Sequence, residues 1–165
     1  MPRHISWPRS RHEGRRVFAF TRPDDRQAQE FARSLGCEWA GGSNETPAES
    51  SDAAIIFAPV GDLVPIALKQ LVKGGTLVLG GIHMSAIPCM PYELLWGERV
   101  IRSVANLTRR DGEEFMDLAA RVVFDITVEP HPLDEANAVL QRLRQGALTG
   151  AAVLVPNAKP SDTSR

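Results

Sequence analysis

The stretch 15-RRVFAFTRPDD-25 predicts a β-strand that runs directly into an α-helix. Val17–Thr21 is a short apolar run, as expected of a strand. Pro23, Asp24 and Asp25 suit the first turn of a helix, because proline needs no amide partner there and acids meet the positive end of the helix dipole. A nucleotide-binding sheet often begins with such a unit. The stretch is therefore either a first strand without its glycine-rich turn or a second strand.

The rest of the chain repeats this alternation of strand and helix. Apolar residues recur at helical spacing in 28–35, 64–71, 115–122 and 136–143. Strands are expected at 53-AAIIFAP-59, 76-TLVLGG-81, 100-VIRSVAN-106, 126–130 and 151-AAVLV-155. The runs at 53–59 and 76–81 do not alternate, so we expect them to be buried on both faces, whereas the charged Arg102 places 100–106 nearer an edge. The fold class is α/β, with a doubly wound parallel sheet.

Residues that commonly start or stop helices set the expected ends of these elements. Thr108 with Asp111 three positions later resembles a capping box at a helix start. Gly146 stops the last helix, and residues 73–74 are expected to end the second one. The polar run 41-GGSNETPAESS-51 is expected to be a loop.

Composition excludes several classes of protein. The chain has 165 residues, enough for one domain, with 43% hydrophobic and 24% charged residues. Its net charge of -1 gives no electrostatic case for nucleic acid or an acidic membrane surface, and no apolar run reaches transmembrane length. Cys37 and Cys89 match no metal or redox spacing, which fits a reduced, cytoplasmic protein without a signal peptide. Residues 1–13 are a basic tail or remnant, for which disorder is favoured over a nucleic-acid-binding arm, and 157–165 a disordered tail.

Ligands of open α/β sheets bind at the carboxyl ends of the strands. These ends are Thr21–Arg22, Ala58–Gly61 and Gly80–His83. The glycine pair lets a flat ring approach the backbone closely, although the same pair could simply make a turn. Thr21–Arg22 stands where an acid would bind a ribose diol. A hydroxyl and an arginine there favour a 2′-phosphate instead, with a solvated surface arginine as the alternative.

Few residues are candidates for catalysis. His83 could touch a substrate or cofactor, whereas His131, between two prolines, is expected in a surface loop. The sequence has no nucleophile elbow, no P-loop, no complete G-x-G-x-x-G and no Cys/His set with metal-ligand spacing. We therefore assign neither a catalytic residue nor a metal ligand.

Four linked runs together resemble the C-terminal half of a zinc-dependent alcohol dehydrogenase of the medium-chain dehydrogenase/reductase superfamily. The runs are 14-GRRVFAFTRPDDRQAQEFARSLGCEWAGG-42, 53-AAIIFAPVGDLVPIALKQLVKGGTLVLGGIHMSAIP-88, 93-ELLWGERVIRSVANLTRRDGEEFMDLAA-120 and 132-PLDEANAVLQRLRQGALTGAAVLVP-156. The resemblance implies that 14–156 is a truncated NAD(P)-binding, Rossmann-type domain with an incomplete doubly wound sheet. It makes 17-VFAFT-21 the second strand, so the family's first strand, glycine turn and N-terminal zinc domain are expected to be missing.

The same resemblance assigns cofactor-binding residues. Thr21 and Arg22 match the selector of the adenosine ribose, and Gly80, Gly81 and Ile82 match the backbone edge against the nicotinamide. The remaining matches are Ala58, Pro59 and Val60 beside the middle of the cofactor, and the segment from Asn106 to Arg109 before the helix that closes over it. Ala151 departs from the pattern, because many relatives carry an arginine there for the pyrophosphate. NADP is slightly favoured over NAD, and zinc belongs to the family but has no ligands here.

The implied function is that of an oxidoreductase, the NAD(P)-binding half of an enzyme that transfers hydride between an alcohol and a nicotinamide cofactor. The chain alone is expected to be inactive. The alternatives are a non-catalytic nucleotide-binding or protein-interaction module, or one half of a split enzyme. Its expected partners are a nicotinamide dinucleotide and either further copies of itself or a missing N-terminal half. Without a first strand, 17–21 should either shift to pair with the 53–59 side or remain an exposed apolar edge.

Overall fold

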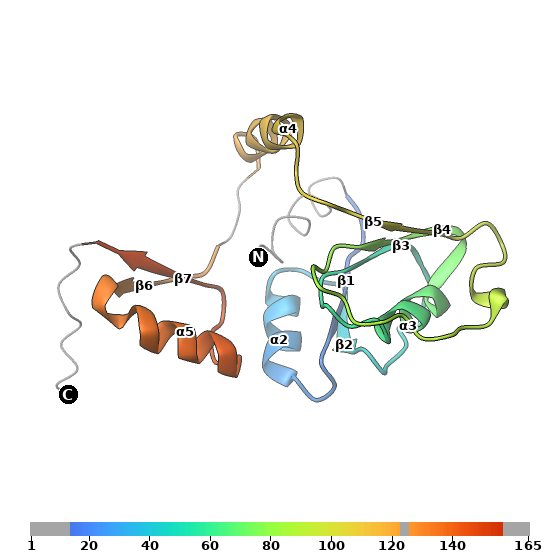
Figure 1. Ribbon diagram of the computed structural model, residues 1–165, viewed down its shortest axis with the longest axis horizontal. Coiled ribbons are helices and arrows are strands. Elements are labelled where there is room, and N and C mark those ends of the chain that lie inside the picture. Colours follow the sequence, from blue (N-terminus) through green and yellow to red (C-terminus); the bar gives the residue numbers. More distant parts are fainter. Residues whose placement is uncertain (1–13, 123–125, 157–165) are drawn as a thin grey trace. The chain divides into compact units, whose positions relative to one another are not determined.

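The computed structural model describes residues 14–122 and 126–156, which fall into two compact units divided after Val123 (Figure 1). Each unit consists of parallel strands with helices between them. Within the described residues, no helix is long and apolar enough to cross a membrane.

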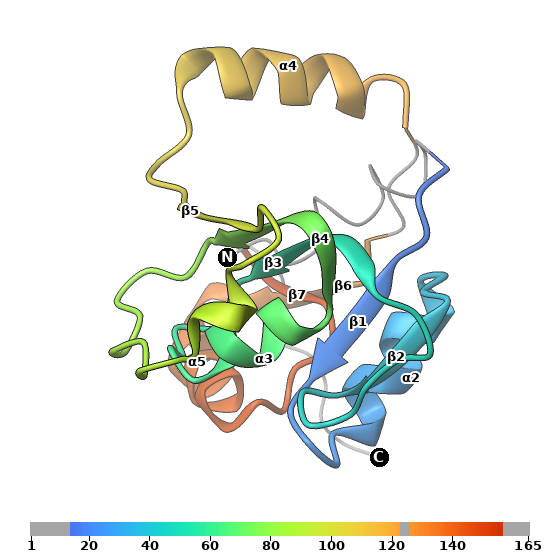
Figure 2. The same ribbon diagram turned by 90° about the vertical axis from the view of Figure 1, so that its right-hand side faces the viewer.

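The first unit contains two parallel sheets (Figure 2). Its elements are β1 (Phe18–Thr21), α2 (Arg26–Ser34), β2 (Trp39–Gly42), β3 (Ser51–Ile56), α3 (Leu63–Lys69), β4 (Leu71–Leu79), η1 (Tyr92–Leu94), β5 (Val100–Ser103) and α4 (Arg109–Ala119). Strands β1 and β2 form one sheet, in which Phe18 lies beside Trp39. Strands β3, β4 and β5 form the other, in that order, so β5 lies at an edge, as the charge at Arg102 predicts.

Two apolar clusters stabilise this unit. The larger lies between α3 and the three-stranded sheet, and Leu68, Leu71 and Leu77 are almost completely buried in it. Burying a leucine side chain contributes about 1.5–3 kcal/mol, so this cluster is the main source of stability. The smaller cluster joins α2 to the β1–β2 sheet through small side chains, among them Ala32 and Cys37.

The second unit is a strand–helix–strand motif. Its elements are β6 (Val128–Pro132), η2 (Leu133–Glu135), α5 (Ala136–Gln145) and β7 (Ala151–Val155), and the two strands pair in parallel. Gly146 ends α5 in the left-handed region, with φ of 71°, so the stop signal in the sequence is confirmed. The capping box at the start of α4 is confirmed too, because Thr108 and Asp111 bond each other's backbone amides.

Several sequence predictions are wrong in detail. Asp24 and Asp25 precede α2 and do not lie in its first turn; Asp25 is the N-cap and its carboxylate accepts a hydrogen bond from the Ala28 amide. The expected loop from 41 begins inside β2, and residues 73–74 lie within β4 and do not end a helix. The last two errors share one cause: pairing with a neighbouring strand decides the conformation of short segments whose own preference for a strand is weak.

The prediction that 53–59 is buried on both faces is also wrong. Ile56 is buried against α3, but the neighbouring Ile55 on the opposite face of β3 is 48% exposed. Among the described helices, α3 contributes Val64 and Leu68 to the cluster that buries Ile56, whereas no residue of α4 is buried.

His131 is not in a surface loop. It lies in β6, with its side chain only 15% exposed, and its Nδ1 is 3.0 Å from a carboxylate oxygen of Glu135 at the start of α5. The flanking prolines are tolerated because β6 lies at the edge of its two-stranded sheet, where a missing amide costs little.

The two cysteines should differ sharply in reactivity. Cys37 is buried, and this burial raises the pKa of its thiol to about 12, whereas Cys89 is exposed. Only the thiolate is nucleophilic, so Cys37 stays protonated and unreactive near neutral pH. Ellman's reagent should label one thiol of the native chain rapidly, and Cys89→Ser should remove that fast phase. Two thiols reacting at one rate would mean that the smaller cluster does not exclude reagent.

Candidate functional site

The loops that follow β3 and β4 are in direct contact, and together they carry six of the ten predicted cofactor-binding residues. The Gly80 amide donates a hydrogen bond of 2.8 Å to the carbonyl of Ile56. A Cβ on Gly81 would lie 3.0 Å from the carbonyl oxygen of Ala58, which is closer than most side chains approach. The structure therefore brings the 58–60 and 80–82 segments together, and glycine is required where the two backbones meet.

Gly61, at the end of the predicted ligand-binding segment 58–61, and Ser85, which the sequence analysis did not single out, join these loops. The Gly61 amide donates to Ser85 Oγ at 2.8 Å, and the Ser85 amide donates to the Pro59 carbonyl at 3.2 Å. A Cβ on Gly61 would lie only 2.1 Å from the carbonyl oxygen of Ala86. No motif or spacing in the sequence marked Ser85.

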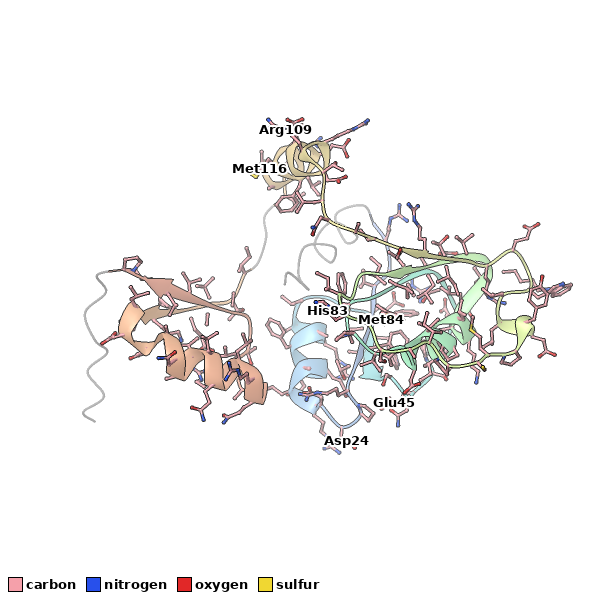
Figure 3. All side chains as sticks on the ribbon, viewed as in Figure 1. Asp24, Glu45, His83, Met84, Arg109 and Met116 are labelled. Atoms are coloured by element: carbon pink, nitrogen blue, oxygen red, sulfur yellow. The ribbon has the colours of Figure 1, made fainter. Side chains whose placement is uncertain are left out.

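Apolar side chains are exposed on these loops. Phe57, Val60 and Ile82 are 39%, 40% and 51% exposed. Of the neighbouring residues labelled in Figure 3, Met84 packs against the larger core cluster, whereas His83 is exposed and has a left-handed backbone with φ of 57°. The loops therefore offer an exposed apolar surface and closely approached backbone, which is what a flat heterocycle needs for docking.

At the end of β1, the Thr21 hydroxyl is engaged inside the protein. It lies 3.0 Å from the Arg22 carbonyl and 3.3 Å from the Gly41 carbonyl, and it accepts a hydrogen bond of 3.2 Å from the Gln29 side chain. It thus connects β1, β2 and α2. Thr21 fixes the local structure, and Arg22 supplies the charge.

The Arg22 side chain is 78% exposed, and its guanidinium is 3.4 Å from Asp25. An exposed pair at this separation contributes little to stability, so the guanidinium remains available to a stronger acceptor such as a phosphate. The turn that follows Arg22 is tight: Asp24, labelled in Figure 3, has a left-handed backbone with φ of 64°. The turn places Arg22 at the carboxyl end of β1, where sequence reasoning expects the ribose selector.

Asn106 and Arg109 are not brought to this site by any contact. Asn106 lies in the exposed stretch after β5, and Arg109 is the first residue of α4. Within the described residues, no hydrogen bond or ion pair links either of them to the ends of β1, β3 or β4. No residue of α4 is buried, and Met116, labelled in Figure 3, is 66% exposed.

The described residues do not fit a zinc ion. They contain no group of three or more His, Cys, Asp or Glu side chains able to hold a metal. Zinc is bound by thiolates, imidazoles and carboxylates converging on one point. We therefore assign no step to zinc in this part of the chain.

The comparisons with known proteins agree on one class. The chain is 40% identical over 153 residues to the probable alcohol dehydrogenase AdhA of Mycobacterium tuberculosis, covering 92% of this chain and 44% of that protein. It is 31% identical over 149 residues to an alcohol dehydrogenase of Moraxella sp. strain TAE123, covering 86% of this chain and 44% of that one. The chain thus spans a little under half the length of these curated relatives. No protein-family profile matches it.

Solved structures show the same fold. The alcohol dehydrogenase of Aeropyrum pernix superposes with a TM-score of 0.75 at 22% identity, covering 93% of this chain and 46% of that one. YhdH of Escherichia coli, solved with bound NADPH, gives 0.70 at 18% identity, covering 88% and 48%. YhfP of Bacillus subtilis, with NAD bound, gives 0.71 at 15% identity, covering 91% and 50%. The prediction of an incomplete Rossmann-type α/β fold is confirmed.

Proposed function

Because this chain is a relative of the zinc-type alcohol dehydrogenases of the medium-chain dehydrogenase/reductase superfamily and matches their C-terminal half, we propose that it is an NAD(P)-binding part of such an oxidoreductase. The reaction class is hydride transfer between an alcohol and a nicotinamide cofactor. The cofactor supplies the hydride chemistry when bound, and the residues of this chain bind and orient it.

The observation that carries the proposal is the meeting of the two loops at Ala58 and Gly81. Because Gly81 has no side chain, a flat ring can lie against the backbone there. The exposed Val60 and Ile82 offer apolar contact beside that ring. Arg22 stands at the end of β1 with its charge exposed, where it can pair with a phosphate near the adenosine ribose. Asn106 and Arg109 are proposed to join only if α4 moves onto the bound cofactor.

Arg22 should give a preference for the phosphorylated cofactor. A hydrogen bond to a charged group contributes about 1.5–3 kcal/mol, so NADP⁺ should bind about 10- to 150-fold more tightly than NAD⁺. Arg22→Ala should remove most of that difference by weakening NADP⁺ alone. Calorimetric titration of both cofactors into wild type, Arg22→Ala and Arg144→Ala measures it, the last as a control with the same change in charge on α5. Equal affinities in wild type would show that Arg22 is not the selector.

We propose further that the chain by itself does not turn over alcohols. The support is the lack of a three-ligand metal group among the described residues. The assay is formation of NADH or NADPH from primary alcohols with added zinc. Turnover that a chelator abolishes would contradict this proposal.

A separate N-terminal half that restores turnover would identify the split enzyme. The alternative, a non-catalytic nucleotide-binding or interaction module, would bind cofactor or a partner without such rescue. We propose a cytoplasmic location and association with further copies or with a complementary half, and the exposed apolar side chains of β3 and α4 support association.

A further inference from the structure

A tight turn at the carboxyl end of β1 holds two opposite charges together. The Asp25 amide donates a hydrogen bond of 3.2 Å to the Arg22 carbonyl, which closes a four-residue turn. Pro23 is the second residue of that turn, and Asp24, the third, has φ of 64°. This is the pattern of a type II turn, in which proline suits the second position and the third needs a positive φ, which aspartate tolerates better than most residues.

The turn brings the side chain of its last residue back to that of its first. Nη2 of Arg22 lies 3.4 Å from Oδ2 of Asp25. The other carboxylate oxygen, Oδ1, accepts a hydrogen bond of 3.1 Å from the Ala28 amide, because Asp25 is the N-cap of α2. The cap fixes the carboxylate, which is 27% exposed, whereas the Arg22 side chain is 78% exposed. Asp25 therefore presents a fixed negative charge to an arginine that can turn toward solvent.

A 2′-phosphate at this place would compete with Asp25 for the guanidinium. Phosphate and carboxylate both accept charge-assisted hydrogen bonds from arginine. To bind the phosphate fully, the Arg22 guanidinium must turn away from Asp25, and the phosphate then lies near a fixed charge of its own sign. Both effects lower the affinity for the phosphorylated cofactor. The unphosphorylated cofactor has no charge at the 2′ position, so its affinity is hardly affected.

The contacts of Asp25 argue against a different role, that of an acceptor for the ribose hydroxyls of the unphosphorylated cofactor. An acid with that role directs its carboxylate at the ribose diol. Here Oδ1 is bonded to the Ala28 amide at the start of α2, and Oδ2 faces Arg22. Asp25 is therefore placed to act on cofactor selection through Arg22.

We propose that Asp25 is a specificity-determining residue of the cofactor site. Its carboxylate competes with the 2′-phosphate for Arg22 and keeps the preference for NADP⁺ below the level that Arg22 alone would give. The inference rests on the proposed function, because it concerns the same site. The selector is then a pair of opposite charges, and the balance between them sets how far the chain distinguishes NADP⁺ from NAD⁺.

Asp25→Asn tests this competition, because asparagine keeps an oxygen for the Ala28 amide and removes the charge. Breaking an exposed ion pair costs a factor of about two to five in affinity, so NADP⁺ should bind about threefold or more tightly to the variant. The affinity for NAD⁺ should stay within about a factor of two, because no charge on that cofactor faces Asp25. Calorimetric titration of both cofactors into the full chain measures these changes.

Two further titrations isolate the contact. Adenosine 2′-monophosphate probes the phosphate contact without the rest of the dinucleotide, and its affinity should rise in Asp25→Asn as that of NADP⁺ does. Asp134→Asn is the matched control, because it removes an exposed carboxylate from η2 in the second unit. It should leave the affinities for all three nucleotides unchanged.

The Arg22→Ala background shows whether Asp25 acts through Arg22. Competition requires both side chains, so Asp25→Asn should raise the affinity for NADP⁺ clearly less when Arg22 is absent. A gain of the same size with and without Arg22 would mean that the carboxylate only repels phosphate, and would overturn the proposal.

Other outcomes would overturn it as well. They are an NADP⁺ affinity that Asp25→Asn leaves unchanged or lowers, and a loss of NAD⁺ affinity alone, which would identify Asp25 as the diol acceptor. If circular dichroism shows that Asp25→Asn unfolds, Asp25→Ser decides the question, because a serine hydroxyl also caps helices. A wild-type chain that binds neither dinucleotide would contradict the proposed function itself. Adenosine 2′-monophosphate then tests the competition separately, and no binding of this probe would overturn the proposal too.

Discussion

Gly61→Ala should lower the free energy of unfolding of the first unit by about 3 kcal/mol, near the upper end of the usual cost of overpacking. The added methyl would lie 2.1 Å from the Ala86 carbonyl oxygen, and that oxygen belongs to backbone, which cannot rotate away. The two loops would have to separate, breaking the hydrogen bond between the Gly61 amide and Ser85. Cofactor affinity should fall as well, because the two loops that are proposed to bind the cofactor would move apart.

Gly80→Ala is the matched control. A methyl at Gly80 would meet Ile56 and Phe57 at 3.5 Å or more, which is ordinary van der Waals contact. Urea unfolding followed by tryptophan fluorescence measures the first unit alone, because all three tryptophans lie within residues 1–123. Equal midpoints for the two variants would mean that the loops after β3 and β4 do not pack as described.

Gly150→Ala should be comparably damaging in the second unit. Gly150 has φ of 85°, and left-handed backbone costs an alanine about 1–2 kcal/mol. The methyl would also lie 2.4 Å from the Thr127 carbonyl oxygen, the acceptor for the Ala151 amide at the start of β7. Together the strain and the clash should cost about 3 kcal/mol and open the pairing of β6 with β7.

Gly74→Ala separates the two causes, because Gly74 has φ of 75° but no atom within 4 Å of an added methyl. It should show the strain alone. Hydrogen exchange of the β6 and β7 amides is the measurement for Gly150→Ala. Amides that stay as protected as in wild type would contradict the clash.

The regular helices could be predicted from the sequence because their apolar residues recur at helical spacing. Helical spacing in 64–71 and 136–143 predicts α3 and α5. Side chains expected on their inner faces are buried, among them Val64, Leu68 and Val139. The start of α4 was predictable because a capping box is local chemistry.

Strand β2 could not be predicted, because its sequence 39-WAGG-42 has weak strand preference. Its conformation comes from tertiary contacts. Its backbone pairs with β1, and the Trp39 ring packs against Phe20 with centroids 4.9 Å apart. A methyl on Gly41 would meet that ring at 2.5 Å, so the glycine makes room for the tryptophan.

The candidate site likewise combines features that the sequence could predict with features that it could not. The meeting of Ala58 with Gly81 follows from a general rule, since carboxyl ends of neighbouring parallel strands share one edge of the sheet. The bonds between Gly61 and Ser85 depend on the path of two irregular loops, which no periodicity encodes. Nor could the sequence show that α4 carries Arg109 without packing on the sheet.

The central claim is that the carboxyl ends of β1, β3 and β4 bind a nicotinamide dinucleotide. Amide chemical shifts of the ¹⁵N-labelled chain, recorded while NADPH is added, test it most directly. The account predicts saturable shifts at Thr21, Arg22, Ala58, Val60, Gly80, Gly81 and Ile82, with Ser85 following through its bond to Gly61. Shifts confined to other parts of the chain, or none at millimolar NADPH, would contradict it.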